Sequence, residues 1–133
     1  MPDFARIREL LTTARVIAVV GLSNRQHRLS YGVSEHMQRT GYRIVPVNPN
    51  ETSVLGEKAP VSLEHVPGEI DIVDIFRRSE FVPEIVEQAI RVGAKSIWMQ
   101  EGVVHEEAAA RARAAGLTVV MDRCILKEHQ RLR

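Results

Sequence analysis

The sequence predicts an α/β fold in which a parallel sheet is covered by helices on both faces. Short apolar runs alternate along the chain with segments of helical periodicity, and such alternation favours a parallel sheet. The run at 16–20 is apolar throughout and mostly β-branched, as expected for a strand buried on both faces. It ends in Gly21, and a helical segment begins near Ser30. This order opens a nucleotide-binding βαβ unit, so we predict one doubly wound, three-layer α/β/α domain over residues 1–133.

Helices are predicted where apolar residues recur with helical spacing. Ile7, Leu10 and Leu11 indicate an amphipathic helix that precedes the first strand and covers the sheet. Glycines that follow the later helical segments suit the left-handed position after a helix end. These segments lie at 30–40, 81–92 and 105–115, with a single helical turn at 62–67 and a short helix within 122–133.

The strands are expected to be parallel and to end at one common edge. The five main strands are predicted at 16–20, 42–47, 70–76, 95–99 and 117–121. Pro46 has no N–H, so its strand should end near it or have a weakly paired neighbour there. Ala59 and Val61 are expected to form a very short edge strand. Right-handed crossovers bring the carboxyl ends of parallel strands to one edge, where ligands bind in such sheets.

Composition and charge limit the classes of function. Hydrophobic residues make up 44% of the chain and charged residues 26%, as in ordinary globular proteins. The net charge of +1 gives no reason to expect nucleic acid or an anionic membrane as a partner. The apolar runs are too short to cross a bilayer, and no secretory signal is visible. Together with a single cysteine, these features predict a cytoplasmic protein.

The glycine turn departs from the common dinucleotide-binding pattern. A G-x-G-x-x-G motif would have its second glycine where this chain has Ser23. Recognition of NAD also expects an acidic residue at the end of the second strand, where this chain has Asn48. Both departures weaken an NAD interpretation. The chain also has no G-x-x-x-x-G-K-[ST] loop that would support ATP chemistry.

Four arginines lie in or beside the predicted ligand edge. Arg25 and Arg28 belong to the loop after the first strand, and Arg77 and Arg78 directly follow a strand predicted to be buried. Guanidinium groups match phosphate oxygens well, although solvated loop charges are the alternative, above all for Arg25. Successive side chains on extended backbone point opposite ways. One of the consecutive pair, which we expect to be Arg77, should therefore face the ligand cleft.

An ordered set of short motifs resembles the small stand-alone CoA-binding domain family, relatives of the CoA-binding domain in succinyl-CoA synthetase α subunits. The resemblance covers about residues 4 to 132. Each motif is weak alone, but the ordered set is fairly specific. The motifs lie at 19–23, 28–31, 45–49, 55–56, 71–78 and 121–124. The chain has Ser79 and Glu101 where this family often carries a proline and an apolar residue.

The resemblance implies a Rossmann-like fold that binds coenzyme A at the predicted edge. The glycine turn and the following helix start would face the phosphates, and the end of the second strand would bracket the adenosine part. The end of the third main strand would line the path of the pyrophosphate or pantetheine, and Gln100 and Gly102 would lie at the end of the next strand. The residues implied are Gly21, Leu22, Ser23, Arg28, Ser30, Tyr31, Val47, Asn48, Pro49, Phe76, Arg77, Arg78, Gln100 and Gly102.

No catalytic or metal-binding residues are expected. The ligase relatives pass phosphate through a histidine on a further domain, which is not expected here, and the five histidines of this chain lack metal-ligand spacing. His105 is expected to cap a helix or to lie on the surface. Cys124 is expected to be a small buried hydrophobe, the alternative being a mixed disulfide with the CoA thiol.

We therefore expect a CoA- or acyl-CoA-binding protein without catalytic machinery of its own. It would act as a carrier, a sensor or a subunit, as a homodimer or with a partner enzyme. The alternatives are a small NAD(P)-dependent oxidoreductase and a structural protein whose ligand edge has decayed.

Overall fold

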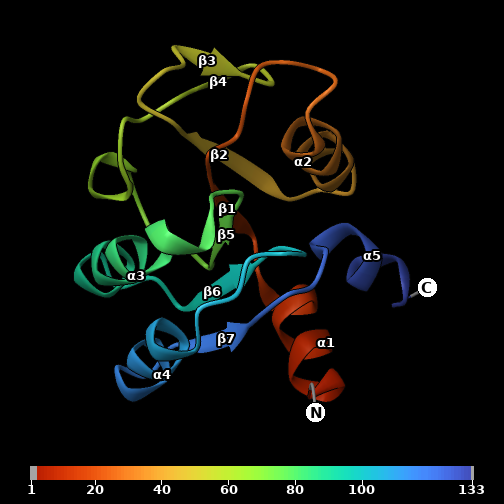
Figure 1. The fold of residues 1–133 in the computed structure, drawn as a ribbon. Coiled ribbons are helices and arrows are strands. Elements are labelled where there is room, and N and C mark those ends of the chain that lie inside the picture. The colour runs from red at the N-terminus through yellow and green to blue at the C-terminus, as the bar shows by residue number, and fades with distance from the viewer. Residues whose placement is uncertain (1–2, 133) are drawn as a thin grey trace.

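The computed structural model describes residues 3–132 and contains one central parallel sheet within them (Figure 1). The strand order is β2-β1-β5-β6-β7, and all four neighbouring pairs are parallel. The order reverses between β1 and β5: β2 lies on one side of β1, and β5 lies on the other side and is followed by β6 and β7. The strands are β1 (Val16–Val20), β2 (Arg43–Val47), β5 (Ile72–Ile75), β6 (Ser96–Met99) and β7 (Thr118–Val120).

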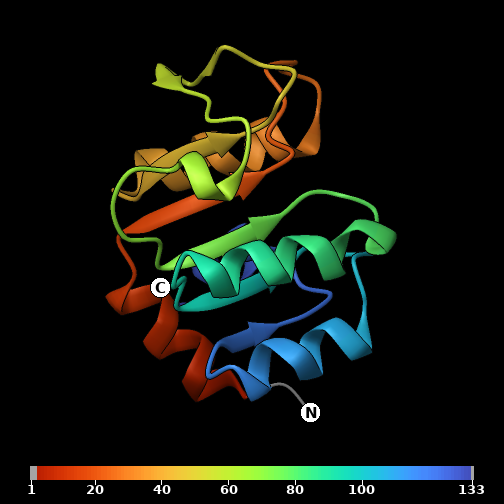
Figure 2. The ribbon, with the colours of Figure 1, turned by 90° about the vertical axis from the view of Figure 1, so that its left-hand side faces the viewer.

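Helices cover both faces of the sheet, which confirms the predicted three-layer α/β/α fold. One face carries α1 (Phe4–Thr13), α2 (Leu29–Arg39) and α5 (Ile125–Gln130). The other carries α3 (Val82–Arg91) and α4 (Glu106–Ala114), which lie in front of the sheet in Figure 2. Single 3-10 turns occur at η1 (Leu63–His65) and η2 (Ser79–Phe81).

Alternate residues of each strand supply two separate cores. Ile17 and Val19 pack towards α1 and α2, whereas Ala18 and Val20 pack towards α3 and α4. The side chain of Trp98 is completely buried on the α1 side, and its Nε1 donates to the carbonyl of Arg123 at 2.8 Å. Both faces of the sheet are covered by helices, so residues of either parity in a strand are buried. This explains why the strand at 16–20 is apolar throughout.

The short strand expected at Ala59 and Val61 is wrong. The chain forms an antiparallel hairpin just before it, from β3 (Ser53–Val54) and β4 (Glu57–Lys58). Leu55 and Gly56 join the two strands with φ angles of 55° and 78°. Two successive positive φ angles are typical of a type I′ hairpin turn, in which leucine is an unusual first residue.

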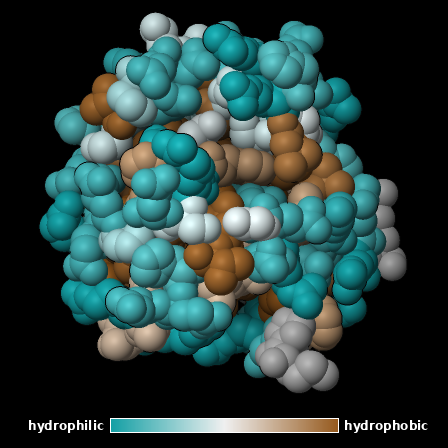
Figure 3. All heavy atoms as spheres, in the orientation of Figure 1, coloured by the Kyte–Doolittle hydropathy of each residue, from teal (hydrophilic) through white to brown (hydrophobic). Residues whose placement is uncertain are grey.

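The expectation for Pro46 is confirmed, since β2 is an edge strand of the sheet and Pro46 is its last residue but one. The surface seen in Figure 3 is mainly hydrophilic, with small separate hydrophobic areas. Within residues 3–132, no helix has both the length and the apolar character that crossing a bilayer requires.

Candidate functional site

Backbone hydrogen bonds join the carboxyl ends of β1, β2 and β5 at the point where the strand order reverses. Gly21 donates its N–H to the carbonyl of Val47, and Phe76 donates to the carbonyl of Val20, both at 2.9 Å. Gly21 has a φ of +90°, and a Cβ built there would lie 2.5 Å from the carbonyl oxygen of Phe76. Only glycine fits this close approach of two backbones. The glycine turn is therefore fixed by the sheet rather than by the loop that follows it.

A pocket of about 460 Å³ opens at this edge. It is lined by residues from the glycine turn, the start of α2 and the ends of β2 and β5. Six of the predicted site residues form part of its wall: Gly21, Ser23, Arg28, Ser30, Asn48 and Phe76. Arg25, Leu29, Asn50 and Glu51 complete it. The structure thus brings together Gly21, Ser23 and Ser30, three of the residues for which the resemblance implied a place at the phosphates.

The glycine turn is fastened to the first turn of α2. The buried Ser30 Oγ accepts a hydrogen bond from the N–H of Ser23 at 3.2 Å. Ser23 Oγ in turn accepts from the N–H of Arg25 at 3.1 Å. Arg28 directly precedes the helix and is exposed. The N-terminus of an eleven-residue helix and two arginines thus border one pocket, an arrangement that favours an anionic ligand.

The end of β2 supplies amide and carboxylate groups to the same pocket. Asn48 donates from Nδ2 to the carbonyl of Leu22 at 3.1 Å and accepts at Oδ1 from Asn50 N–H at 2.9 Å. Glu51 Oε2 accepts from the N–H of Asn24 at 2.8 Å. The loop after β1 is therefore held against the segment after β2 by two side chains, one neutral and one acidic.

Arg77 and Arg78 differ in exposure, although both guanidinium carbons lie over the Phe81 ring, that of Arg78 at 5.4 Å from its centre. Arg77 is half-buried, and its Cδ would lie 2.9 Å from a Cβ at Gly21. Its guanidinium lies 4.3 Å from the ring centre of Phe81. The Arg78 side chain is 78% exposed and pairs with Glu80 at 3.5 Å. Arg77 is thus the member of the pair that reaches the glycine turn, while a role of either in ligand binding stays a prediction.

Other predicted residues lie outside the wall of this pocket: Leu22, Tyr31, Val47, Pro49, Arg77, Arg78, Gln100 and Gly102. The side chains of Leu22, Val47 and Gln100 are buried, so the first two could meet a ligand at this edge only through their backbone. Tyr31 packs partly against the α1-side core, and Pro49 is exposed. Gly102 lies one strand further along the sheet and donates to Asp122 Oδ1 at 2.7 Å.

Gln100 is part of a buried polar pair that the sequence did not reveal. Its Nε2 donates to Asp74 Oδ1 at 2.6 Å, and its Oε1 has no hydrogen-bond partner within the described residues. Burial raises the pKa of Asp74 to about 7, although the hydrogen bond from Gln100 acts in the opposite direction. The signal that could have found this pair is a carboxylate in the middle of the apolar run at 70–76.

The structure also shows the surroundings of Glu101, Cys124 and His105, which the sequence analysis singled out. Glu101 is exposed, and its two carboxylate oxygens accept from Lys127 Nζ on α5 at 3.1 and 3.2 Å. Cys124 is a buried hydrophobe, as expected, and so lacks the exposure that a mixed disulfide needs. His105 caps α4 through Nδ1, which accepts from the N–H of Ala108 at 3.1 Å. Among residues 3–132, no three acidic, histidine or cysteine side chains gather where they could hold a metal ion.

Sequence reasoning missed Glu51 as a pocket residue. An acidic residue was sought at the end of the second strand, and Asn48 was found there. Glu51 follows three positions later and lies in the pocket wall. A search that allowed for the turn at 48–51 would have found it.

The strand order and the pocket at its reversal define a Rossmann-like α/β domain with a pocket at the ends of β1, β2 and β5. Residues 15–130 match the family described as the CoA binding domain. The chain belongs to this CoA-binding domain family, as the sequence motifs indicated.

Relatives of two sizes are similar to this chain. It is 47% identical over 128 residues to the uncharacterized protein YneT of Bacillus subtilis, covering 96% of this chain and 95% of that protein. It is 34% identical over 84 residues to the alpha subunit of the ADP-forming acetate–CoA ligase II of Pyrococcus furiosus. That match covers 62% of this chain but only 18% of the ligase subunit.

Solved structures share the whole fold. A hypothetical protein from Pyrococcus horikoshii aligns with a TM-score of 0.95 and 40% identity, over 98% of this chain and 92% of that one. The cell-free protein ID.343 from Thermus thermophilus aligns with a TM-score of 0.94 and 31% identity, over 99% and 100% of the two chains.

Proposed function

We propose that this protein binds coenzyme A or an acyl-CoA in the pocket between β1 and β5, and that residues 1–133 act as one binding domain. The observation that carries the proposal is the position of Gly21, whose backbone lies close to the carbonyl of Phe76. The glycine turn forms part of the wall of a pocket beside the start of α2, where a ligand would bind. Membership of the CoA-binding domain family identifies the class of ligand. A cytoplasmic location fits this ligand and the single cysteine.

The pocket suggests how the parts of CoA would be distributed. The phosphates would lie against Gly21, Ser23 and the first turn of α2, where amide dipoles and Arg28 favour negative charge. The adenosine part would lie beside Asn48, at the end of β2. The pantetheine arm would pass Phe76 and Arg77. Each part would thus meet a group of matching polarity.

We propose further that the protein carries no catalytic machinery of its own. The pocket wall offers arginines, serines, amides and one carboxylate, but no pair of side chains arranged as nucleophile and base. The protein would therefore present CoA as a carrier, a sensor or a subunit, either as a homodimer or with a partner enzyme.

The NAD(P)-dependent oxidoreductase alternative gains no support from the comparisons. Ser23 stands where a dinucleotide site has its second glycine, and its N–H is already engaged by Ser30. We retain NAD and NADP only as competitors in the binding experiment.

Calorimetric titration of the purified protein with CoA, acetyl-CoA, NAD and NADP tests the proposal. We expect CoA or acetyl-CoA to bind and the two nicotinamide nucleotides to bind far more weakly. Arg28→Ala should weaken CoA binding, whereas Arg39→Ala, at the exposed far end of the same helix, should not. Tight binding of NAD without CoA would establish the alternative. A silent titration of folded protein would indicate a decayed ligand edge.

A further inference from the structure

Asp74 and Gln100 form a buried pair close to the candidate ligand pocket, although neither belongs to its wall. Their exposed fractions are 1% and 2%. Asp74 lies on β5, and Phe76, two residues further along the chain, forms part of the pocket wall. Since a strand rises about 3.3 Å per residue, about 7 Å of backbone separates Asp74 from that wall. A charge on Asp74 would therefore act on a charged ligand in the pocket.

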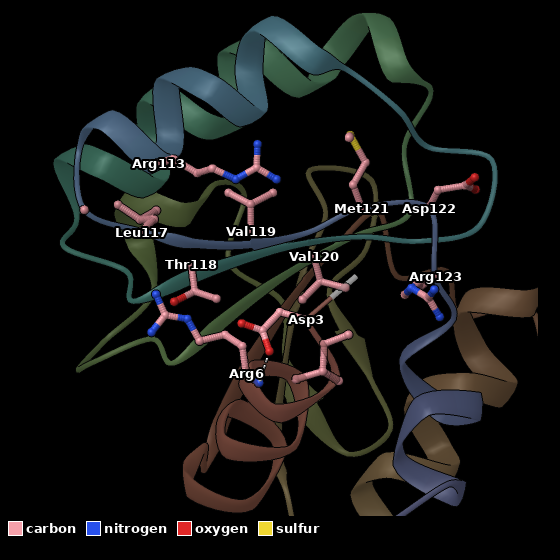
Figure 4. A pocket seen from close by; sticks show the side chains of 12 residues that line it. Asp3, Arg6, Arg113, Leu117, Thr118, Val119, Val120, Met121, Asp122 and Arg123 are labelled. Atoms are coloured by element: carbon pink, nitrogen blue, oxygen red, sulfur yellow. Dashed lines mark hydrogen bonds between the residues drawn. The ribbon is translucent and has the colours of Figure 1, made fainter. Parts of the chain in front are cut away.

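The larger hollow of the molecule, of about 760 Å³, lies further from this pair. Figure 4 shows it along β7, with α1 on one side and α4 on the other. β6 lies between β7 and β5, and neighbouring strands are about 4.8 Å apart, so β7 itself is about 10 Å from β5. A charge bound in the β1–β5 pocket would thus affect Asp74 more strongly than one bound in this hollow.

Asp74 faces the side of the sheet that carries α1, α2 and α5. Ile72 and Trp98 belong to the core on that side, and alternation along β5 and β6 places Asp74 and Gln100 there too. In this core α1 contributes apolar side chains alone. Within residues 3–132, only Gln100 acts on the pKa of Asp74 besides burial. The titratable and charged groups on this side from α2, the residue before β2, and α5 with the residues before it are Tyr31, His36, Tyr42, Arg123, Cys124, Glu128 and His129.

The amide group of Gln100 favours a proton on Asp74. Nε2 donates to Asp74 Oδ1 at 2.6 Å, but Oε1 of the same amide has no hydrogen-bond partner within the described residues. A neutral carboxyl has an O–H donor, which an ionised carboxyl lacks. Burial also favours the neutral form and raises the pKa of Asp74 to about 7. The charge of this side chain therefore changes in the neutral pH range.

We propose that binding of a phosphate-containing ligand in the β1–β5 pocket is linked to a proton on Asp74. This inference rests on the proposed binding of CoA. The phosphates of the ligand repel an ionised Asp74 but not a neutral one, so the bound ligand holds the proton in place. Linkage is reciprocal, and loss of the proton weakens binding by the same factor. One ligand charge about 10 Å from Asp74 gives a factor of about ten at an effective dielectric constant of about 20.

The carboxyl ¹³C resonance of Asp74 in the unmodified protein reports its ionisation directly. It is followed through a pH titration, first without ligand and then with CoA in saturating excess. We expect a midpoint near pH 7 in the free protein. The midpoint should move up by about one pH unit when CoA is bound. This measurement needs no variant and is independent of the titration of the ligand's own phosphate.

Asp74→Asn removes the titrating group and keeps an oxygen that accepts from Gln100. The affinity for CoA is measured by calorimetry at the same pH for the variant and the unmodified protein, because the ligand's own phosphate also titrates near pH 6. We expect equal affinities at about pH 6 and an approximately tenfold advantage of Asp74→Asn at about pH 9. His27→Gln is the matched control, since His27 is an exposed titratable residue of the loop after β1. It should behave like the unmodified protein.

An unchanged ¹³C midpoint of Asp74 with CoA bound would overturn the proposal. The same holds if Asp74→Asn and the unmodified protein show parallel pH dependence, or if His27→Gln is the variant that abolishes the difference between the two ends of the pH range. If folded protein binds no CoA at any pH, the proposed function itself is wrong, and this inference falls with it.

Discussion

Arg77 and Arg78 are neighbours in the sequence with different surroundings, and the difference predicts unequal roles. Arg77 is half-buried beside Gly21, whereas Arg78 is exposed and pairs with Glu80. A charge-assisted hydrogen bond to phosphate contributes about 1.5–3 kcal/mol, which corresponds to about 10- to 150-fold in affinity. We expect Arg77→Ala to weaken CoA binding by about this factor, measured by calorimetry at low salt, and Arg78→Ala to change it little.

High salt should reduce the loss caused by Arg77→Ala, because screening already weakens the contact in the unmodified protein. Unchanged affinity in both alanine variants at low salt would mean that the pair is a solvated turn. The backbone amides of the glycine turn would then hold the phosphate alone.

Asp74 predicts a dependence of stability on pH. Burial raises its pKa from 3.8 in the unfolded chain to about 7, so the folded protein binds the proton more tightly between these values. The contribution of Asp74 to the free energy of unfolding is therefore most favourable below about pH 4. It decreases as the pH rises towards about 7. The loss is at most about 4 kcal/mol.

Asp74→Asn removes this titration and keeps an oxygen that can accept from Gln100. We expect its free energy of unfolding to vary less than that of the unmodified protein between about pH 5 and 8. The free energy of unfolding is measured by urea titration, with the fluorescence of the buried Trp98 as the signal. An equally steep pH dependence in the variant would show that Asp74 is not the group responsible.

Residue identities predicted which loops meet at the pocket, but they did not reveal the buried polar pair. Gly21, Asn48 and Phe76 could be placed there because each follows a predicted strand. Asp74 looked like part of an apolar run, because its partner Gln100 comes from another strand and is far away in the sequence. A hydrogen bond between side chains of different strands depends on the tertiary fold, and a local sequence pattern does not predict it.

At the scale of elements, the β1–α2 turn depends on one glycine. Gly21→Ala would bring a Cβ to 2.5 Å from the Phe76 carbonyl oxygen and would also occupy a positive φ. Gly93→Ala is the matched control, since Gly93 also has a positive φ but nothing within 4 Å of an added Cβ. Backbone strain should lower the free energy of unfolding of both variants by about 1 kcal/mol or more. The close contact with Phe76 should lower that of Gly21→Ala by about 1–3 kcal/mol more. Urea unfolding compares them; equal losses would mean that the approach to Phe76 is not tight.

The starts of three strands are joined by Asp71. Its Oδ2 accepts from the backbone N–H groups of Arg15 and Val16, both at 2.9 Å, and Lys95 Nζ lies 3.2 Å from Oδ1. Burial acts to raise the pKa of Asp71, but the bonds from Val16, Arg15 and Lys95 outweigh it, and the pKa lies below its usual 3.8. This contribution to stability is present above about pH 4 and is lost as the pH falls below it.

Asp71→Ala should lower the free energy of unfolding at neutral pH by about 1–3 kcal/mol, because two amides lose their acceptor. Glu69→Ala, at the exposed neighbouring carboxylate that also approaches Lys95, is the control and should cost little. Chemical denaturation at pH 7 measures both, and similar losses in the two variants would contradict this account.

Elements with regular periodicity were predictable, and those set by a single turn were not. The main helices and strands follow runs such as 16–20 and 70–76, whose apolar pattern is local. The β3–β4 hairpin escaped because its turn places Leu55 at a positive φ, where asparagine or aspartate would have been the expected signal. Glu51 was missed for a related reason, since the turn at 48–51 moves the acidic side chain beyond the end of β2.

For the whole molecule, the parallel order of strands determines where a ligand can meet several backbone ends at once. β1, β2 and β5 end together, and Gly21, Asn48 and Phe76 follow them. The sequence predicted this convergence, because alternating strands and helices leave few topologies open. It could not predict how the loop after β1 is positioned, because this depends on a hydrogen bond from Asn24 to Glu51, which is far away in the sequence.

The most direct test of the central claim is a titration of the ¹⁵N-labelled protein with coenzyme A, followed at each backbone amide. We predict that the largest shifts occur at Gly21, Ser23 and Ser30 and at Asn48, the residues that surround the β1–β5 pocket. The β7 edge, at the other end of the sheet, should remain unchanged. Shifts confined to residues outside this pocket, or none with CoA in large excess over folded protein, would contradict the account.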